Sequence, residues 1–278
     1  MVNVPLAAER LFSVGSWPVT NAIINAWLAV AVFAAIALVL NRSVSERPRG
    51  LQNMAEILLE KLLAFFDQVT GDRDKSRRFL PIAGTFFFFI LLSNWMGLLP
   101  GTGSIGVWHL VHGELELVPV LRPANSDLNL TLAMALISVI GSHIFGIVSL
   151  GFFTHLNKFI QIGTIWRALK TFQPLKILTA CVEFIVGIIE IFSECAKIAS
   201  LSLRLFGNIF AGEVLITVIG SLISVIVPLP FMALELIVGV IQAVVFSLLT
   251  VVYLTMSTAA PHGSHEKHRE ESLQPVHP

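Results

Sequence analysis

Residues 177–227 form a long apolar stretch that nevertheless carries several charged and polar side chains. Six of these side chains follow one another at intervals of 7, 4, 3, 7 and 4 residues, which are the spacings of one helix face. At about 100° per residue they fall within roughly 80° of one another. The six are Glu183, Glu190, Glu194, Lys197, Arg204 and Asn208. We therefore predict one apolar helix with one polar stripe.

The length of this stretch limits how it can lie in a membrane. A continuous helix of this size would be about 75 Å long at 1.5 Å per residue, whereas the hydrocarbon core of a bilayer is about 30 Å thick. No proline interrupts the stretch before Pro228. We therefore predict a strongly tilted helix, with any bend at Gly207 or Gly212.

Arg204 is the residue of this helix that most needs an explanation. An arginine at the centre of a membrane helix costs roughly 2.5–3.5 kcal/mol on insertion scales, and it cannot lose its proton. It therefore needs a carboxylate partner or a hydrated cavity. A structural ion pair within the helix is one alternative, but Glu190 and Glu194 are better placed to pair with Lys197.

The composition identifies the class of protein. Of the 278 residues, 55% are hydrophobic and 13% are charged, whereas about 25% of the residues of soluble domains are charged. The chain is thus predicted to be an all-α integral membrane protein in contact with the lipid bilayer. Its net charge of zero gives no indication of nucleic-acid binding. The two cysteines, Cys181 and Cys195, are interpreted as small apolar side chains.

The chain is read as one membrane domain with about five membrane-embedded helices, the last two forming a long tilted hairpin. The predicted embedded segments are residues 21–40, 79–100, 128–153, 177–227 and 231–257. Residues 101–126 are expected to form a loop, and the polar tail at 261–278 is expected to be disordered.

Residues 49–69 have apolar side chains at helical spacing, with charged side chains on the other faces. This pattern predicts an amphipathic helix on the cytoplasmic membrane surface. A helix packed against a partner protein would have the same pattern. The apolar positions are Leu51, Met54, Leu58, Leu62, Phe65 and Val69.

The distribution of positive charge predicts the orientation of the chain. About eight Lys and Arg residues lie between the first two spans, one between the second and third, four between the third and fourth, and two in the tail. Because basic loops stay in the cytoplasm, five spans require the N-terminus outside and the C-terminus inside.

Two sequence blocks in the last two helices resemble a known family. They read SLSLRLFGNIFAGE (200–213) and LELIVGVIQAVVFSLLTVVYL (234–254). The chain resembles subunit a of the rotary F-type ATP synthase of bacteria, and the resemblance extends back to about Phe79 through FILLSNWMGLLPG and RPANSDLNLTLAMAL. The first 50 or so residues resemble this family only in general layout.

The resemblance implies a stator subunit in a bacterial plasma membrane, without a nucleotide site or a cofactor of its own. Its expected partners are the ring of hairpin c subunits and the b-type peripheral stalk. Two offset half-channels, one open to each side of the membrane, would carry protons to and from the ring. Each proton that crosses gains about 2.3 kcal/mol per 100 mV.

The resemblance also assigns roles to residues. Arg204 is the expected essential arginine, which favours the ionised ring carboxylate and blocks direct passage between the half-channels. Its expected half-channel residues are Asn208, Glu213, Glu235 and Gln242. Further candidates for lining the channels are Asn94, Asp127, Asn129, Glu190 and Tyr253. Hydrogen bonds between helices are the alternative role for Asn208 and Gln242.

One pair of positions departs from the family pattern. Much of the family has one glutamate and one histidine at the positions of Glu213 and Glu235, whereas this chain has two glutamates. Since two close carboxylates do not both ionise easily, we hypothesise that they share and relay a proton. An all-carboxylate path also leaves sodium coupling open.

Other functional classes have less support in the sequence. The chain lacks a GxxxxGK[ST] loop, a His-Glu-x-x-His motif and a GxSxG motif. A self-contained secondary transporter with Arg204 as an anion site is the main alternative, although no internal repeat is seen. A haem or quinone site would need paired intramembrane histidines, and His143 is interpreted as a lone packed residue. His109 and His112 have no third ligand nearby, so no metal site is expected.

Overall fold

The computed structural model describes residues 5–42, 44–99, 105–111, 114–159, 174–222 and 227–259, and of these the side chains of 109–117, 156–159, 174–181 and 183 are not described. The predicted tail at 261–278 lies outside the described residues. The chain divides into two compact units. Met1–Ile137 and Ile198–Val252 make up the first unit, and Ser138–Lys197 and Tyr253–Pro278 make up the second.

Five helices in the described part of the chain are long and apolar enough to cross a membrane. This confirms the prediction of an all-α integral membrane protein with five embedded helices. The five are α1 (Asn21–Arg42), α3 (Arg73–Gly97), α4 (Leu128–Leu150), α7 (Pro174–Leu222) and α8 (Pro228–Thr258). The apolar part of α7 is Phe184–Leu222.

Some helix ends differ from the predicted ones, for local reasons. The predicted 128–153 helix is interrupted at Gly151, which has a φ of 86°, a left-handed conformation that favours glycine. A separate short helix, α5, follows as Phe152–Phe159. At its N-terminus, α3 begins six residues before the predicted Phe79. Asp72 caps it there by accepting a hydrogen bond from the backbone N–H of Asp74 at 2.9 Å.

Two short β-hairpins add to the helices. β1 (Arg10–Val14) pairs antiparallel with β2 (Trp17–Thr20), and the turn between them contains Gly15 with a φ of 65°. β3 (Gly106–Val111) pairs with β4 (Glu114–Pro119) inside the segment predicted to be a loop. A short 3-10 turn, η2 (Ala124–Ser126), leads into α4.

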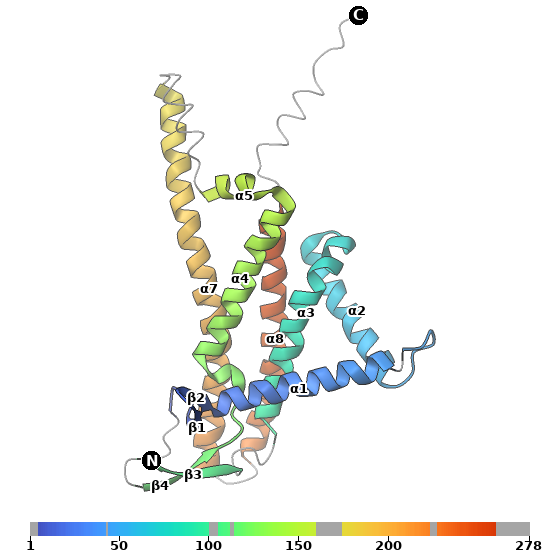
Figure 1. Ribbon diagram of the computed structural model, residues 1–278, viewed down its shortest axis with the longest axis vertical. Coiled ribbons are helices and arrows are strands. Elements are labelled where there is room, and N and C mark those ends of the chain that lie inside the picture. Colours follow the sequence, from blue (N-terminus) through green and yellow to red (C-terminus); the bar gives the residue numbers. More distant parts are fainter. Residues whose placement is uncertain are drawn as a thin grey trace, which may run out of the picture. The chain divides into compact units, whose positions relative to one another are not determined.

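The amphipathic helix α2 (Leu51–Thr70) packs on α3 with one part of its apolar surface (Figure 1). Gly71, with a φ of 66°, ends the helix and allows the sharp reversal into α3. The side chains buried in this contact include Leu62 and Phe66. Leu51 and Met54, at the start of the predicted apolar face, are exposed. That face therefore remains available to a membrane surface or a partner protein, the two alternatives left open by the sequence.

Helices α3 and α8 lie side by side and run in opposite directions. Near one end of the contact, Ser247 Oγ donates to the Ala83 carbonyl at 2.6 Å. Near the other end, Trp95 Nε1 donates to the Leu236 carbonyl at 3.3 Å. Between them, Gly239 lies against Asn94, where an added Cβ would approach the Asn94 Cβ to 3.3 Å. This close contact fixes the register of α8 against α3.

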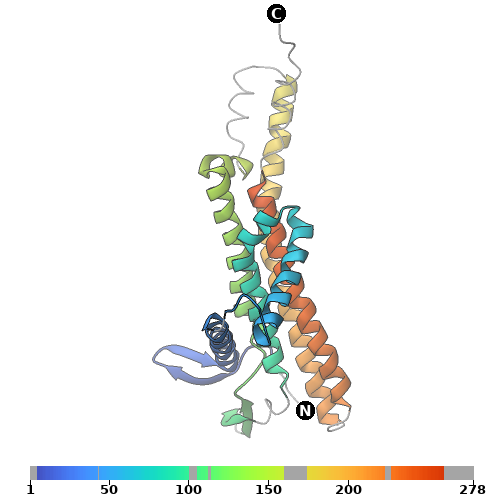
Figure 2. The same ribbon diagram turned by 90° about the vertical axis from the view of Figure 1, so that its right-hand side faces the viewer.

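Helix α1 crosses α3 instead of running alongside it (Figures 1 and 2). The crossing is held by aromatic contact between Phe33 and Phe88, whose ring centroids are 5.5 Å apart. It is also held by the fully buried Asn25, whose Nδ2 donates to the Ser93 carbonyl of α3 at 3.4 Å and to the Arg122 carbonyl at 2.6 Å. A buried amide that is hydrogen-bonded to backbone specifies one crossing point, because other positions would leave it unpaired.

Candidate functional site

Arg204 lies in the apolar part of α7 and is exposed on the surface of the chain. Its Nη2 donates a weak hydrogen bond of 3.4 Å to Ser200 Oγ, one turn earlier in the same helix. Within the described residues, no carboxylate forms an ion pair with it. The neighbouring Leu203 is also exposed, at 55%, and Asn208 is exposed one turn later. Arg204 is thus a guanidinium presented outward from an apolar helix.

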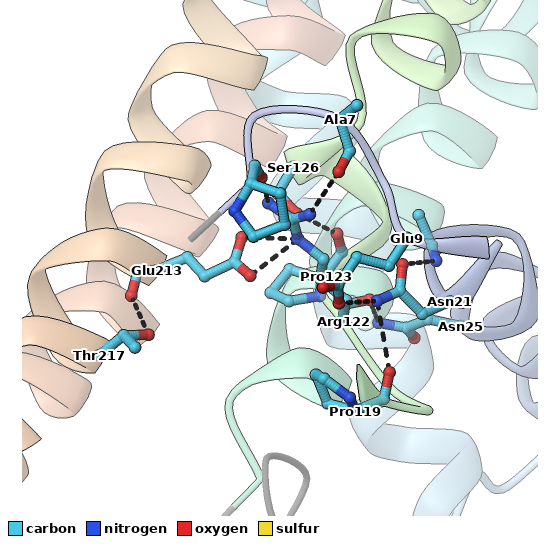
Figure 3. A network of polar contacts seen from close by, with 12 residues as sticks. Ala7, Glu9, Asn21, Asn25, Pro119, Arg122, Pro123, Ser126, Glu213 and Thr217 are labelled. Carbon is cyan, nitrogen blue, oxygen red and sulfur yellow. Dashed lines mark hydrogen bonds and ion pairs between the residues drawn. The ribbon is translucent and has the colours of Figure 1, made fainter. Parts of the chain in front are cut away.

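Glu213, also on α7, forms an ion pair that the sequence did not reveal. Arg122 Nε lies 2.8 Å from Glu213 Oε1 and 3.0 Å from Oε2 (Figure 3). The Arg122 side chain is only 3% exposed. Its two Nη atoms donate to the carbonyls of Ala7 and Pro5 at 3.2 and 3.0 Å. Arg122 therefore connects the N-terminal segment, the loop before α4 and helix α7.

The energetics of this pair depend on its burial. Removing one partner of a buried ion pair typically costs 3–5 kcal/mol, because the other charge is left uncompensated. A sequence signal for this role existed, since Arg122 is the only Lys or Arg between residues 79 and 157. A lone cation between two membrane spans calls for a carboxylate partner, but sequence alone could not tell which one.

Glu235 lies on α8, and its carboxylate is close to Gly212 of α7. The residue is 8% exposed, and its Oε1 is buried without a hydrogen-bond partner among the described residues. A Cβ added at Gly212 would overlap the Glu235 carboxylate. The carboxylate therefore fills the space that the missing side chain leaves. Glu213 has Arg122 as its ion-pair partner, and the sharing of a proton between Glu213 and Glu235 stays a hypothesis.

Gln242, two turns after Glu235 on α8, is buried at 8% exposure. The two residues are seven positions apart, so they share a helix face. The hydrogen bond that the structure gives Arg204 goes to Ser200, so the pairing of Gln242 with Arg204 stays a prediction. A buried amide on the same face as a buried carboxylate nevertheless makes this side of α8 polar.

The three candidates at the α3–α4 connection have structural contacts of their own. Asn94 is buried on α3, where its Oδ1 accepts from Asn125 Nδ2 at 2.7 Å. Asp127 precedes α4, and its Oδ1 accepts from the backbone N–H and the Nδ2 of Asn129 at 2.9 and 3.0 Å. This is the geometry of a helix N-cap. Asp127 and Asn129 therefore stabilise the start of α4 whether or not they line a channel.

The remaining candidates, Glu190 and Tyr253, belong to the second unit. Tyr253 lies under Lys197, whose Nζ is 5.3 Å from the ring centroid. The interpretation of His143 as a lone histidine is wrong, because its Nδ1 lies 3.2 Å from His155 Nε2. The break at Gly151 causes this contact, since it turns α5 back so that His155 can reach α4. The predicted pairing of Glu194 with Lys197 is present, at 2.6 Å.

No group of three His, Cys, Asp or Glu side chains suited to a metal ion occurs among the described residues. The side chains of His109 and His112 are outside that description. The arrangement thus consists of a guanidinium on α7, two carboxylates with different surroundings, and buried amides. Such groups can move or hold an ion, and they include no nucleophile with an adjacent base.

Comparison with known proteins agrees with this chemistry. Residues 23–255 match the family described as ATP synthase A chain. The chain is 32% identical to ATP synthase subunit a of Moorella thermoacetica over 245 residues, which cover 88% of this chain and 94% of that protein. It is 30% identical to ATP synthase subunit a 1 of Syntrophotalea carbinolica over 240 residues, 86% of each chain.

A third relative, ATP synthase subunit a of Gloeobacter violaceus, is 31% identical over 233 residues, covering 83% of this chain and 80% of that one. The matched region begins just inside α1 and ends shortly before the end of α8, so it includes every helix between them. The chain therefore belongs to the ATP synthase subunit a family, as a multi-pass membrane component of the complex that takes part in ATP synthesis and ion transport.

Proposed function

We propose that this chain is the stator that couples proton flow to rotation of a ring of hairpin subunits, and that Arg204 is the coupling residue. The observation that carries the proposal is the environment of Arg204. It is a permanent cation in an apolar helix, exposed on the surface of its own chain, with no carboxylate partner among the described residues. Because such a charge is costly in a membrane, the missing carboxylate has to come from another subunit.

The partner that fits is a ring of subunits that each present one membrane-embedded carboxylate. As each carboxylate reaches Arg204, the guanidinium favours its ionised form, and the proton leaves. The same charge repels a proton that would otherwise pass directly from one half-channel to the other. The pairing has to be transient, which agrees with an exposed arginine rather than one locked in a buried pair like Arg122.

The proposed half-channel toward the outside uses the polar face made by Glu213, Glu235 and Gln242. Glu235 has a buried carboxylate oxygen without a hydrogen-bond partner among the described residues, which suits a group that accepts and releases a proton. Glu213 is held in an ion pair by Arg122. In this proposal Glu235 carries the proton, and the ion pair of Glu213 with Arg122 lines the half-channel without carrying the proton.

The location and the other partners follow from the same proposal. The subunit would lie in a bacterial plasma membrane with its N-terminus outside and its C-terminus in the cytoplasm, as the basic loops predict. It would have no nucleotide site, and b-type subunits of the peripheral stalk would hold it against the torque of the ring.

The test is ATP synthesis by vesicles that contain the whole complex with Arg204→Ala. We expect synthesis to fall to background while the complex still assembles, because the ring carboxylates are no longer made to release their protons. Arg78→Ala removes an exposed arginine near the start of α3 and serves as the control that keeps synthesis. Synthesis at the wild-type rate in Arg204→Ala would refute the proposal.

Isolation of the complex separates this function from a self-contained transporter. A stator should be purified together with a ring of small hairpin subunits, whereas a transporter should be active alone. Pumping that requires sodium would identify the sodium-coupled version of the same subunit.

A further inference from the structure

The β1–β2 hairpin carries large apolar side chains that are not covered by the rest of the chain. Phe12, Val14 and Trp17 are 53%, 64% and 78% exposed. We name these three side chains the aromatic hairpin face. Single exposed apolar side chains are common on protein surfaces, whereas a contiguous group of them marks a surface that contacts something other than water.

The pairing of the two strands places these side chains on the same side of the hairpin. Val14 pairs with Trp17 across the strands. Directly opposite residues of an antiparallel pair project to the same face, and so do residues two apart on one strand, such as Phe12 and Val14. Val19, which pairs with Phe12 at the base of this face, is buried. The chain therefore covers this face at its base and leaves it uncovered toward the turn.

The hairpin is joined directly to the first turn of α1. No linker separates them, because β2 ends at Thr20 and α1 begins at Asn21. The backbone N–H of Asn21 donates to the Glu9 carbonyl at 3.1 Å, and that of Ile23 donates to Thr20 Oγ1 at 3.4 Å. Asn21 is fully buried, and its Nδ2 donates to the Pro119 carbonyl at 3.3 Å. These contacts hold the hairpin at the end of a membrane-embedded helix.

The hairpin extends to one side of α1 instead of continuing along the helix axis. Figure 2 views α1 nearly along its axis, and the hairpin, in faint blue, projects sideways from it. The 22 residues of α1 give a length of about 33 Å, which matches the hydrocarbon core when the helix stands close to upright. A segment that projects sideways from the end of such a helix lies along the membrane surface.

The chemistry of the hairpin suits the boundary between lipid headgroups and acyl chains. Tryptophan is enriched at that boundary, because its ring is apolar while its indole N–H can still reach a polar partner. A two-stranded sheet has unpaired backbone groups along its edges, which excludes it from the hydrocarbon core. Ser13, on the opposite side from the aromatic hairpin face, is exposed and polar. One face can therefore enter the lipid while the other face and the edges stay hydrated.

The surroundings of the hairpin favour lipid over another protein as the covering. Trp27 and Leu28 on α1 are exposed as well, so the hairpin and the helix that it joins both present apolar side chains outward. Arg10 is the one charged residue between positions 10 and 20, which gives a protein partner little charge to recognise. The hairpin also precedes residues 23–255, which match the family, so the family match does not account for it.

We propose that the β1–β2 hairpin is an interfacial anchor, with Phe12, Val14 and Trp17 inserted into the bilayer at the membrane surface where α1 begins. The inserted face reaches the boundary of headgroups and acyl chains, at a depth of about 5–10 Å. Burial of apolar surface drives the insertion, so it does not depend on the charge of the headgroup. The anchor fixes the depth and the rotation of α1. This contact with lipid does not rest on the proposed role of Arg204.

The test uses the whole complex in phospholipid vesicles, with a polarity-sensitive fluorophore on a single cysteine of this chain. Cys181 and Cys195 are first replaced by serine. Trp17→Cys places the label on the aromatic hairpin face, and Ser13→Cys places it near the same turn on the opposite face. Quenching by a nitroxide on a lipid acyl chain is compared with quenching by iodide in the water.

We expect the lipid nitroxide to quench the label at position 17 about threefold more than at position 13, and iodide to show the reverse. Vesicles of phosphatidylcholine, with or without phosphatidylglycerol, should give the same result, because the headgroup charge is not recognised. Equal iodide quenching at the two positions would overturn the proposal, since the face would then lie in water. A label at 17 that neither quencher reaches would also overturn it, because another protein would then cover the face.

A second pair of variants tests the tryptophan side chain without a label at its position. Val14→Cys carries the label and is combined with Trp17→Glu, because a carboxylate on this face resists transfer into lipid. We expect iodide quenching at position 14 to rise about threefold, whereas Ser13→Glu with the same label leaves it unchanged. All three side chains are exposed, and isolation of each complex checks assembly. A label at 14 that stays protected from iodide in Trp17→Glu would refute the anchor.

Discussion

At the scale of single residues, two arginines in the same chain have opposite surroundings. Arg122 is buried and bound to Glu213 and to two backbone carbonyls. Arg204 is exposed, with a hydrogen bond to a serine of its own helix. A buried guanidinium with a full set of acceptors holds structure, whereas an exposed one in an apolar helix is available to a partner. The two arginines should therefore respond differently to substitution.

Arg122→Gln should destabilise the protein, because it leaves the Glu213 carboxylate without its partner. A cost of about 3–5 kcal/mol is typical for one half of a buried pair. The double variant Arg122→Gln with Glu213→Gln should lose less than the sum of the two single variants, since neither charge is then left alone. Thermal unfolding of the purified complex measures this. Additive losses in the double variant would show that the two side chains do not stabilise each other.

The residues of the site were partly predictable from sequence. The helix spacing of the polar stripe predicted the pairing of Glu194 with Lys197, and the two are in contact. The partner of Glu213 was not predictable, because Arg122 is 91 residues away along the chain. The contact of His143 with His155 was missed for a local reason. It depends on the left-handed Gly151, whose effect on chain direction a helix-period argument does not include.

At the scale of helices, close approach between α7 and α8 is set by Gly212. Gly212→Ala would place a methyl group where the Glu235 carboxylate lies, so that either the helices separate or the carboxylate moves. We expect proton pumping to fall at least tenfold although every titratable group is retained.

Gly220→Ala on the same helix is the matched control for this prediction, because its Cβ would meet only Pro228 at an ordinary 3.8 Å. Pumping rates of the two variant complexes in vesicles make the comparison. Equal rates in Gly212→Ala and Gly220→Ala would show that the position of the Glu235 carboxylate is unimportant.

The direction of α1 bears on the tilt of the other helices. Its 22 residues give a length of about 33 Å, close to the thickness of a hydrocarbon core. If α1 stands upright, then α3, which it crosses, and α8, which runs beside α3, are both tilted. This agrees with the tilt expected from the 49 residues of α7. Length and hydropathy thus predicted the helices well, whereas the two hairpins lacked a comparable signal.

The tilt gives a prediction for single cysteines placed along α8. In an upright helix of 31 residues, accessibility to a water-soluble thiol reagent should change at two sharp boundaries, one near each end. In a tilted helix it should vary with helical period over most of the length, because one face lies nearer to water. Labelling in intact membranes, after replacement of the native cysteines, distinguishes the two patterns. A sharp boundary near each end, without periodic variation between the two, would contradict the tilt.

At the scale of the whole molecule, the described chain is a membrane protein whose own contacts leave one functional face open. On α7, apolar residues such as Leu203, next to Arg204, and Leu215, three turns later, are exposed. Lipid can cover these apolar side chains, but it offers no membrane-embedded carboxylate to the guanidinium. In the proposed function another subunit supplies that carboxylate. From the charge alone the sequence indicated a carboxylate partner or a hydrated cavity, and the ring subunit followed from the resemblance. The positive charge of Arg204 indicates that the partner group is a carboxylate. The position of the partner subunit on α7 depends on contacts outside this chain.

The most direct measurement is disulfide cross-linking from the face that carries Arg204. In a chain with Cys181 and Cys195 replaced by serine, a cysteine is placed at Leu203, which is exposed, or at Leu205, which is 1% exposed. Single cysteines are placed along the hairpin of the small ring subunit. The account predicts rapid cross-links to the ring from position 203, at the depth of the ring carboxylate, and none from position 205. Absence of ring cross-links from 203 in an active complex would contradict it.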